Sequence, residues 1–128
     1  MKRTLIYMTI ALMAIAASLT IASASTRGDK EVTIIGEVVD QPCYDGNNAK
    51  RGASHKGCAV ACAKRGNQLA IVQDDTNAVY SITGDWAANK NEKLVEFVAE
   101  MVEVKGTITE KDGKKFLNIS SIKKVEMK

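Results

Sequence analysis

Four residues with metal-binding side chains fall within one segment of twenty residues. They are Cys43, His55, Cys58 and Cys62, and the 128-residue chain has no other cysteine or histidine. Thiolates and imidazole are soft ligands that suit Zn(II) or Cu(I). If the segment around Cys58 and Cys62 is helical, their side chains share one face, because they stand at positions i and i+4. With His55 one turn earlier, the spacing predicts a Cys3His or Cys2His metal site.

The same cysteines also allow two other interpretations. A disulfide from Cys43 to Cys58 or Cys62 would hold the segment against the rest of the domain, as small exported domains often require. An odd number of cysteines then leaves one thiol free. A free thiol beside basic residues favours the thiolate form, which would suit a redox protein. The absence of a C-x2-C pair argues against a zinc ribbon or a thioredoxin-like site.

The charge around the cysteines is basic. No acidic residue lies between Asp45 and Gly66, whereas five basic residues do, namely Lys50, Arg51, Lys56, Lys64 and Arg65. A basic rim favours a small anionic ligand as a partner and disfavours a bare cation. The aromatic residues are too few and scattered to form a stacking platform for bases, so we expect no nucleic-acid partner. With one histidine and no paired catalytic motif, we also expect no enzymatic activity.

The amino-terminal segment 1–24 is typical of a secretory signal. Lys2 and Arg3 precede an apolar run at 5–21, and Ala22-Ser23-Ala24 is a small-residue cleavage site. Removal of Lys2 and Arg3 would lower the formal net charge from +3 to +1. We therefore predict a periplasmic or secreted bacterial protein cleaved near Ala24. A membrane association is expected only if this segment is retained as an anchor.

The rest of the chain predicts one small domain at 32–128, after a flexible lead-in at 25–31. Five runs rich in β-branched residues predict strands at 32–40, 69–73, 79–83, 101–109 and 116–125. Short helices are expected at 58–66, which Gly66 would cap, and at 89–99, with Asn89 or Asn91 as the N-cap. The cysteines and the histidine then lie in an insertion, 43–66, between the first two strands.

Five strands with a helix between the third and the fourth is the order of the oligonucleotide/oligosaccharide-binding fold, the OB-fold. The segment VEVKGTITEKDG at 102–113 resembles the V-x-V-x-G-x-I hairpin of small exported bacterial OB-fold proteins. The pattern GEVVDxxCY, followed by the histidine and CAxxCAxxG, resembles that of an uncharacterised group of such proteins. The resemblance implies an all-β domain, a five-stranded OB-fold barrel with one or two short helices. It implies no particular activity, because OB-folds host many unrelated functions.

The pair Cys58 and Cys62 with His55 is also similar to the copper site of the copper-delivery proteins of cytochrome oxidase assembly. Those proteins have a thioredoxin-like fold, whose pattern this chain lacks, so the similarity extends only to ligand chemistry. The leading hypothesis is an exported metal-binding or metal-handling protein, with copper or zinc held by Cys43, His55, Cys58 and Cys62. The alternatives are a disulfide-held binding module, which would contact an unknown periplasmic protein, and a thiol-redox protein.

Overall fold

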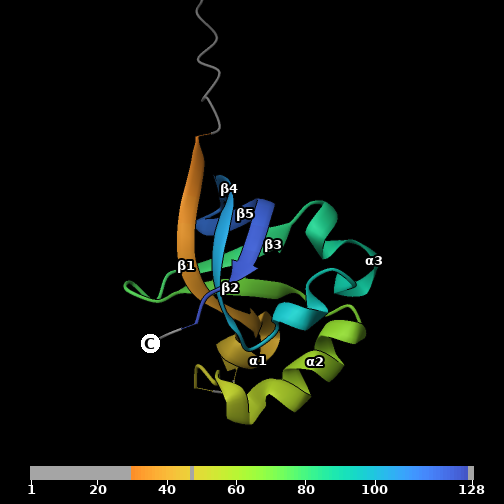
Figure 1. Cartoon of the computed structure of the whole chain (residues 1–128). Helices are drawn as coiled ribbons and strands as arrows, with labels where there is room; N and C mark the ends of the chain where they lie inside the picture. The colour runs from red at the N-terminus through yellow and green to blue at the C-terminus, as the bar shows by residue number, and fades with distance from the viewer. Residues whose placement is uncertain (1–29, 47, 127–128) are drawn as a thin grey trace, which may run out of the picture.

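The computed structural model describes residues 30–46 and 48–126 (Figure 1). The expected signal segment and the cleavage site near Ala24 lie outside the described residues. The described part is mostly β, with five strands and a few short helices. The strands are β1 (Glu31–Asp40), β2 (Leu69–Gln73), β3 (Val79–Thr83), β4 (Met101–Lys111) and β5 (Lys114–Lys124). Each overlaps a run that was predicted as a strand, so the prediction of a mostly β domain is confirmed.

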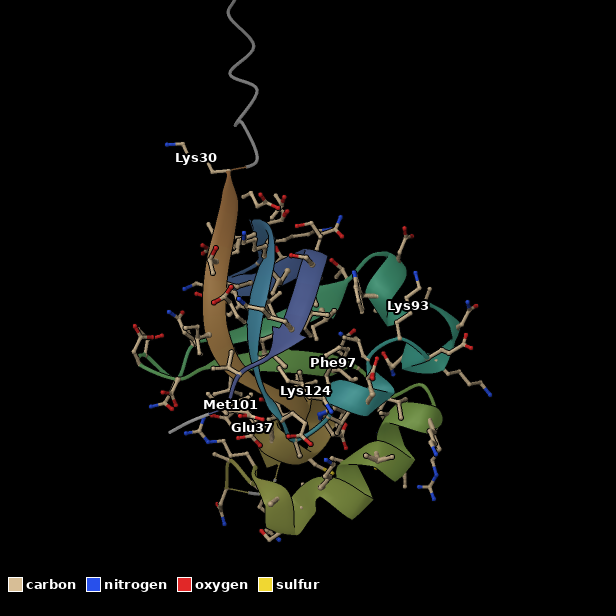
Figure 2. All side chains as sticks on the ribbon, in the orientation of Figure 1. Lys30, Glu37, Lys93, Phe97, Met101 and Lys124 are labelled. Carbon is tan, nitrogen blue, oxygen red and sulfur yellow. The ribbon has the colours of Figure 1, made fainter. Side chains whose placement is uncertain are left out.

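The strands form one sheet in the order β1-β2-β3-β5-β4, which closes into a barrel because β4 also pairs with β1. Residues 31–37 of β1 pair with β4, and Glu37 stands opposite Met101 at the end of this pairing (Figure 2). The second half of β1 pairs with β2, and β3 pairs with β5 in parallel. Gly36 belongs to both pairings of β1, and a β-carbon there would meet the carbonyl oxygen of Val72 at 2.3 Å. Only glycine fits this crossing without displacing β2.

Side chains that alternate along the strands fill the interior of the barrel. Those of Ile34 and Val38 point inward from β1, as the period of two along a strand requires. The largest apolar side chains that are almost fully buried are Leu69, Ile71, Ile82, Leu94, Leu117, Val38, Val72, Val98, Val102 and Val104. The core thus draws on every strand and on the segment between β3 and β4.

The insertion between β1 and β2 contains three helical segments. They are α1 (Gln41–Gly46), the 3-10 turn η1 (Ala53–His55) and α2 (Lys56–Lys64). Helix α1 follows β1 directly, and α1 and α2 lie together at the end of the barrel opposite the start of β1 (Figure 1). The predicted helix at 58–66 corresponds to α2, and Gly66, with φ at 93°, follows its end. The helix α1 was not predicted, and Pro42 is compatible with it because proline is tolerated in the first turn of a helix.

The prediction of one helix at 89–99 was wrong. After the short turn η2 (Asp85–Ala87), the segment holds α3 (Ala88–Asn91) and the 3-10 turn η3 (Val95–Phe97). Three successive residues, Asn89, Lys90 and Asn91, have positive φ angles, which no continuous right-handed helix allows. Val98 then becomes extended and forms a parallel bridge with Val38. A bent chain therefore buries Leu94 and Val98 in the core and packs Val95 and Phe97 partly against it.

Candidate metal centre

The three cysteines converge on one point at the end of the barrel. Cys43 lies in α1, immediately after β1, and Cys58 and Cys62 lie one turn apart on α2. The three sulfur atoms are all within 4.8 Å of one another. Cys58 is exposed and the other two are half-buried, so the cluster lies at the protein surface. Residues that are 15 or more positions apart in sequence are thus brought together by the turn of the chain from β1 into α1.

Helix α2 presents its thiols because its other face is fixed in the core. Ala59 and Ala63 are buried and belong to the main apolar cluster. The side-chain amide of Asn91 donates hydrogen bonds to the carbonyl oxygens of Ala63 and Asn67, both at 2.9 Å. The Ala63 carbonyl, at the end of α2, also accepts a hydrogen bond from the backbone N–H of Gly66, and Asn67 lies in the chain that follows the helix. The orientation of α2 is therefore set by packing and by one asparagine from α3.

The amino-terminal side of α2 is held by two acidic residues of the barrel. Glu37 of β1 accepts a hydrogen bond from the backbone N–H of Gly52. Lys56 forms an ion pair with Glu100, which lowers the pKa of that carboxyl group. One of the five basic residues expected around the cysteines is therefore already paired. These contacts attach the insertion to the barrel on both sides of η1.

None of the three cysteines forms a disulfide in the structure. The disulfide from Cys43, which was the alternative to a metal site, is therefore not present in the structure. The insertion is attached to the barrel without a disulfide, through the packing of Ala59 and Ala63 and the hydrogen bonds of Asn91 and Glu37. All three sulfur atoms remain free to act as ligands.

Asp40 lies beside the cysteines and was not among the predicted site residues. It is the last residue of β1, and only 1% of its surface is exposed. It raises the pKa of the Cys43 thiol to about 11, mainly through a hydrogen-bonding contact that favours the protonated form, and it raises the pKa of Cys62 in the same way. The alternation along β1 could have predicted that Asp40 is buried, since it continues the inward series of Ile34, Gly36 and Val38.

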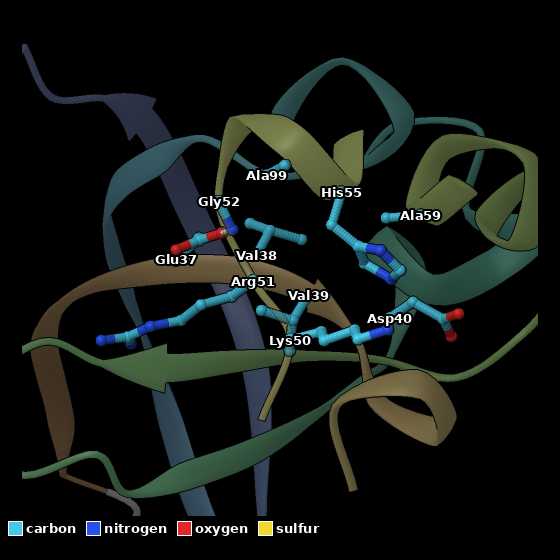
Figure 3. Close-up of a pocket in the computed structure, with 10 residues that line it drawn as sticks. All are labelled: Glu37, Val38, Val39, Asp40, Lys50, Arg51, Gly52, His55, Ala59 and Ala99. Atoms are coloured by element: carbon cyan, nitrogen blue, oxygen red, sulfur yellow. Dashed lines mark hydrogen bonds between the residues drawn. The ribbon is translucent and has the colours of Figure 1, made fainter. Parts of the chain in front are cut away.

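His55 lies outside the group of three sulfurs, at a cavity that Asp40 also lines. It lies in η1, and its Nε2 atom is buried without a hydrogen-bond partner among the described residues. Its ring lines a small cavity together with Asp40, Lys50 and Ala59 (Figure 3). The group of ligand atoms within 4.8 Å of one another contains the three sulfurs, and neither the His55 ring nor the Asp40 carboxylate belongs to it. The structure thus brings together three of the four predicted ligands and leaves His55 next to them.

The sulfur positions suit a metal ion with three thiolate ligands. With Zn–S bonds of about 2.3 Å, tetrahedral geometry separates two sulfurs by roughly 3.8 Å. Three sulfurs within 4.8 Å of one another can reach that geometry through small side-chain rotations. The raised pKa values of Cys43 and Cys62 oppose the expectation of low-pKa thiols in that segment. A metal ion would release protons from these thiols when it binds.

Comparison with protein-family models gave no match for this chain, and comparison with curated proteins gave no significant match. Among the described residues, no helix combines the length and the apolar character needed to cross a membrane.

The raised pKa of Cys43 predicts slow alkylation in the metal-free protein. At pH 8, a pKa near 11 in place of 9.0 lowers the thiolate fraction about a hundredfold, and the higher nucleophilicity of a more basic thiolate recovers about tenfold. We therefore expect iodoacetamide to modify Cys43 about tenfold more slowly in the folded chain than in urea. Peptide mass spectrometry over time measures both rates. Equal rates in the two states would contradict the effect of Asp40 on this thiol.

Proposed function

We propose that this protein is an exported, non-enzymatic metal-binding or metal-handling protein whose site is the cysteine cluster of α1 and α2. The observation that supports this most directly is the approach of three sulfurs to within 4.8 Å of one another. Cys43, Cys58 and Cys62 are the thiolate ligands in this proposal. Three soft ligands at a surface position suit Zn(II) or Cu(I), and partial exposure lets the ion enter and leave.

The fold in this proposal is an OB-fold barrel that acts as a rigid support. The strand order, the antiparallel pairing of β1 with both β2 and β4, and the parallel pairing of β3 with β5 support it. The insertion between β1 and β2 then carries the site. Export to the periplasm is proposed from the amino-terminal sequence alone, where a basic start, an apolar run and Ala22-Ser23-Ala24 follow one another.

A metal titration of the chain 25–128 tests the proposed function. The protein is reduced, its three thiols are counted with a thiol reagent, and Zn(II) or Cu(I) is added in competition with a chromophoric chelator of known affinity. We expect one equivalent of metal to bind with a Kd of about 50 nM or lower, in the range of other thiolate sites. Binding should protect all three thiols from the reagent. If fully reduced protein binds neither ion, the proposal is wrong.

A further inference from the structure

The carboxylate of Asp40 is the most poorly satisfied group in the described part of the chain. It is 1% exposed, and neither of its oxygens has a hydrogen-bond partner that meets ordinary geometry. A buried carboxylate without a partner costs several kcal/mol, so such groups are normally paired or bound to a metal. Each ion pair found among the described residues involves a lysine with Glu100 or Glu103, and none involves Asp40.

The surroundings of Asp40 show which side of it lacks a partner. Lys50 and His55 line the cavity on one side, but the carboxylate is turned away from both (Figure 3). On the other side lie the thiols of Cys43 and Cys62, and Asp40 is the largest influence on the pKa of each. The buried carboxylate therefore faces Cys43 and Cys62, although it lies outside the group of ligand atoms within 4.8 Å of one another, which contains the three sulfurs alone. A side-chain rotation of Asp40 would bring one of its oxygens to the remaining position of a tetrahedron.

We propose that a carboxylate oxygen of Asp40 is the fourth ligand of this site, which makes it a Cys3Asp site for a divalent ion such as Zn(II). This inference rests on the proposed function, which leaves Zn(II) and Cu(I) open, and it favours Zn(II) as the bound ion. Zn(II) in a closed site takes four ligands in a tetrahedron, and three thiolates leave one position for Asp40. Cu(I) is softer and is favoured by thiolates over carboxylates, so Asp40 adds little to its binding.

Charge also favours a divalent ion. Three thiolates and one carboxylate carry four negative charges, of which Zn(II) neutralises two and Cu(I) only one. Because Asp40 is almost fully buried, water cannot compensate for the excess. Lys50, which lines the cavity beside Asp40, reduces the remaining negative charge of the loaded site. Lys50 would therefore stabilise the loaded site, whereas the basic residues of this segment were expected to disfavour a bare cation.

The isosteric substitution Asp40→Asn tests the proposal. In the chain 25–128, we expect Asp40→Asn to weaken Zn(II) binding at least about tenfold and to change Cu(I) binding by less than about threefold. His55→Ala serves as the matched control and should leave both affinities within about threefold. The affinities are measured by chelator competition, after thermal unfolding has shown that each metal-free variant is folded.

A second measurement needs no variant. His55 is the only histidine, so its two ring nitrogens give the only imidazole signals in a 15N NMR spectrum. We expect Zn(II) to leave both signals without the large shift that coordination causes, while X-ray absorption shows three sulfurs and one lighter donor. Zinc binding that is unaffected by Asp40→Asn, or a coordinated His55 nitrogen, would overturn the assignment of Asp40 but leave the proposed function intact. Failure of the wild-type chain to bind zinc would overturn both.

Discussion

Replacing Cys62 with serine should lower the affinity for Zn(II) and for Cu(I) by at least about a hundredfold. Cys62 shares helix α2 with Cys58. Like Cys43, it also lies next to the carboxylate of Asp40. A serine hydroxyl is a poor ligand for soft ions, and even the loss of groups that only orient a ligand costs 10- to 100-fold in affinity. Chelator competition with the reduced variant measures the effect.

The matched control for this variant is Ala61→Ser, which adds a hydroxyl group to the neighbouring position on the same helix. Ala61 is exposed, so the change keeps all three thiols and disturbs no packing. We expect its metal affinities to equal those of the wild type within about twofold. If Cys62→Ser and Ala61→Ser bind the ions equally well, the three sulfurs do not form the site.

The stability of the cysteine variants separates a ligand from a structural role. Cys58 is exposed, and α2 is anchored through Ala59 and Ala63 on another face of the helix. Substitution of an exposed residue away from the core changes stability by about 0.5 kcal/mol or less, so metal-free Cys58→Ser should unfold at nearly the wild-type temperature. The zinc-loaded wild type, in contrast, should gain stability with zinc concentration, because the ion binds the folded state.

The sequence predicts the strands of this fold well for a physical reason. The run of β-branched residues at 32–40 specifies a strand, and the series Ile34, Gly36 and Val38 on one of its faces is buried in the barrel as expected. The segment 89–99 lacks such a guide. Its apolar residues are compatible with a helix, but the left-handed conformation of three successive residues and the bridge of Val98 to Val38 depend on tertiary contacts.

In the candidate site, too, the sequence predicts local geometry but not the contacts that depend on the tertiary fold. Spacing along a helix brings Cys58 and Cys62 together, and it requires no knowledge of the fold. The position of Cys43 depends on α1, which was not predicted, and the choice between Asp40 and His55 depends on how the insertion folds back. Alternation along β1 would have placed Asp40 on the inner face. An acidic residue at a buried position beside a cysteine was the available signal for a ligand.

Replacing Asn91 with alanine should destabilise the domain by about 1–3 kcal/mol. Asn91 is 2% exposed, and its amide group is the donor for the carbonyl oxygens of Ala63 and Asn67. A buried polar group that loses its partner costs about 1–3 kcal/mol. The carbonyl of Asn67 would lose its partner, whereas that of Ala63 keeps the backbone N–H of Gly66. Urea unfolding of the metal-free protein, monitored by circular dichroism, measures the change.

The control is Asn89→Ala, because the same substitution is made in a similar backbone conformation. Asn89 has a φ of 52° and Asn91 a φ of 59°, so alanine meets a comparable conformational penalty at both positions. Asn89 is exposed, however, and the difference between the two variants therefore isolates the buried hydrogen bonds. A difference below about 1 kcal/mol would contradict the role assigned to the Asn91 amide.

The same variant connects stability with the site. The bonds of Asn91 fix the carboxyl-terminal end of α2, next to Cys62, so their loss should let that end of the helix fray. In this variant, part of the free energy of zinc binding is used to order the frayed end of α2. The affinity of Asn91→Ala for Zn(II) should therefore fall, although every ligand is kept. Saturating zinc should recover part of the lost stability. An unchanged affinity would mean that α2 is positioned by the packing of Ala59 and Ala63 alone.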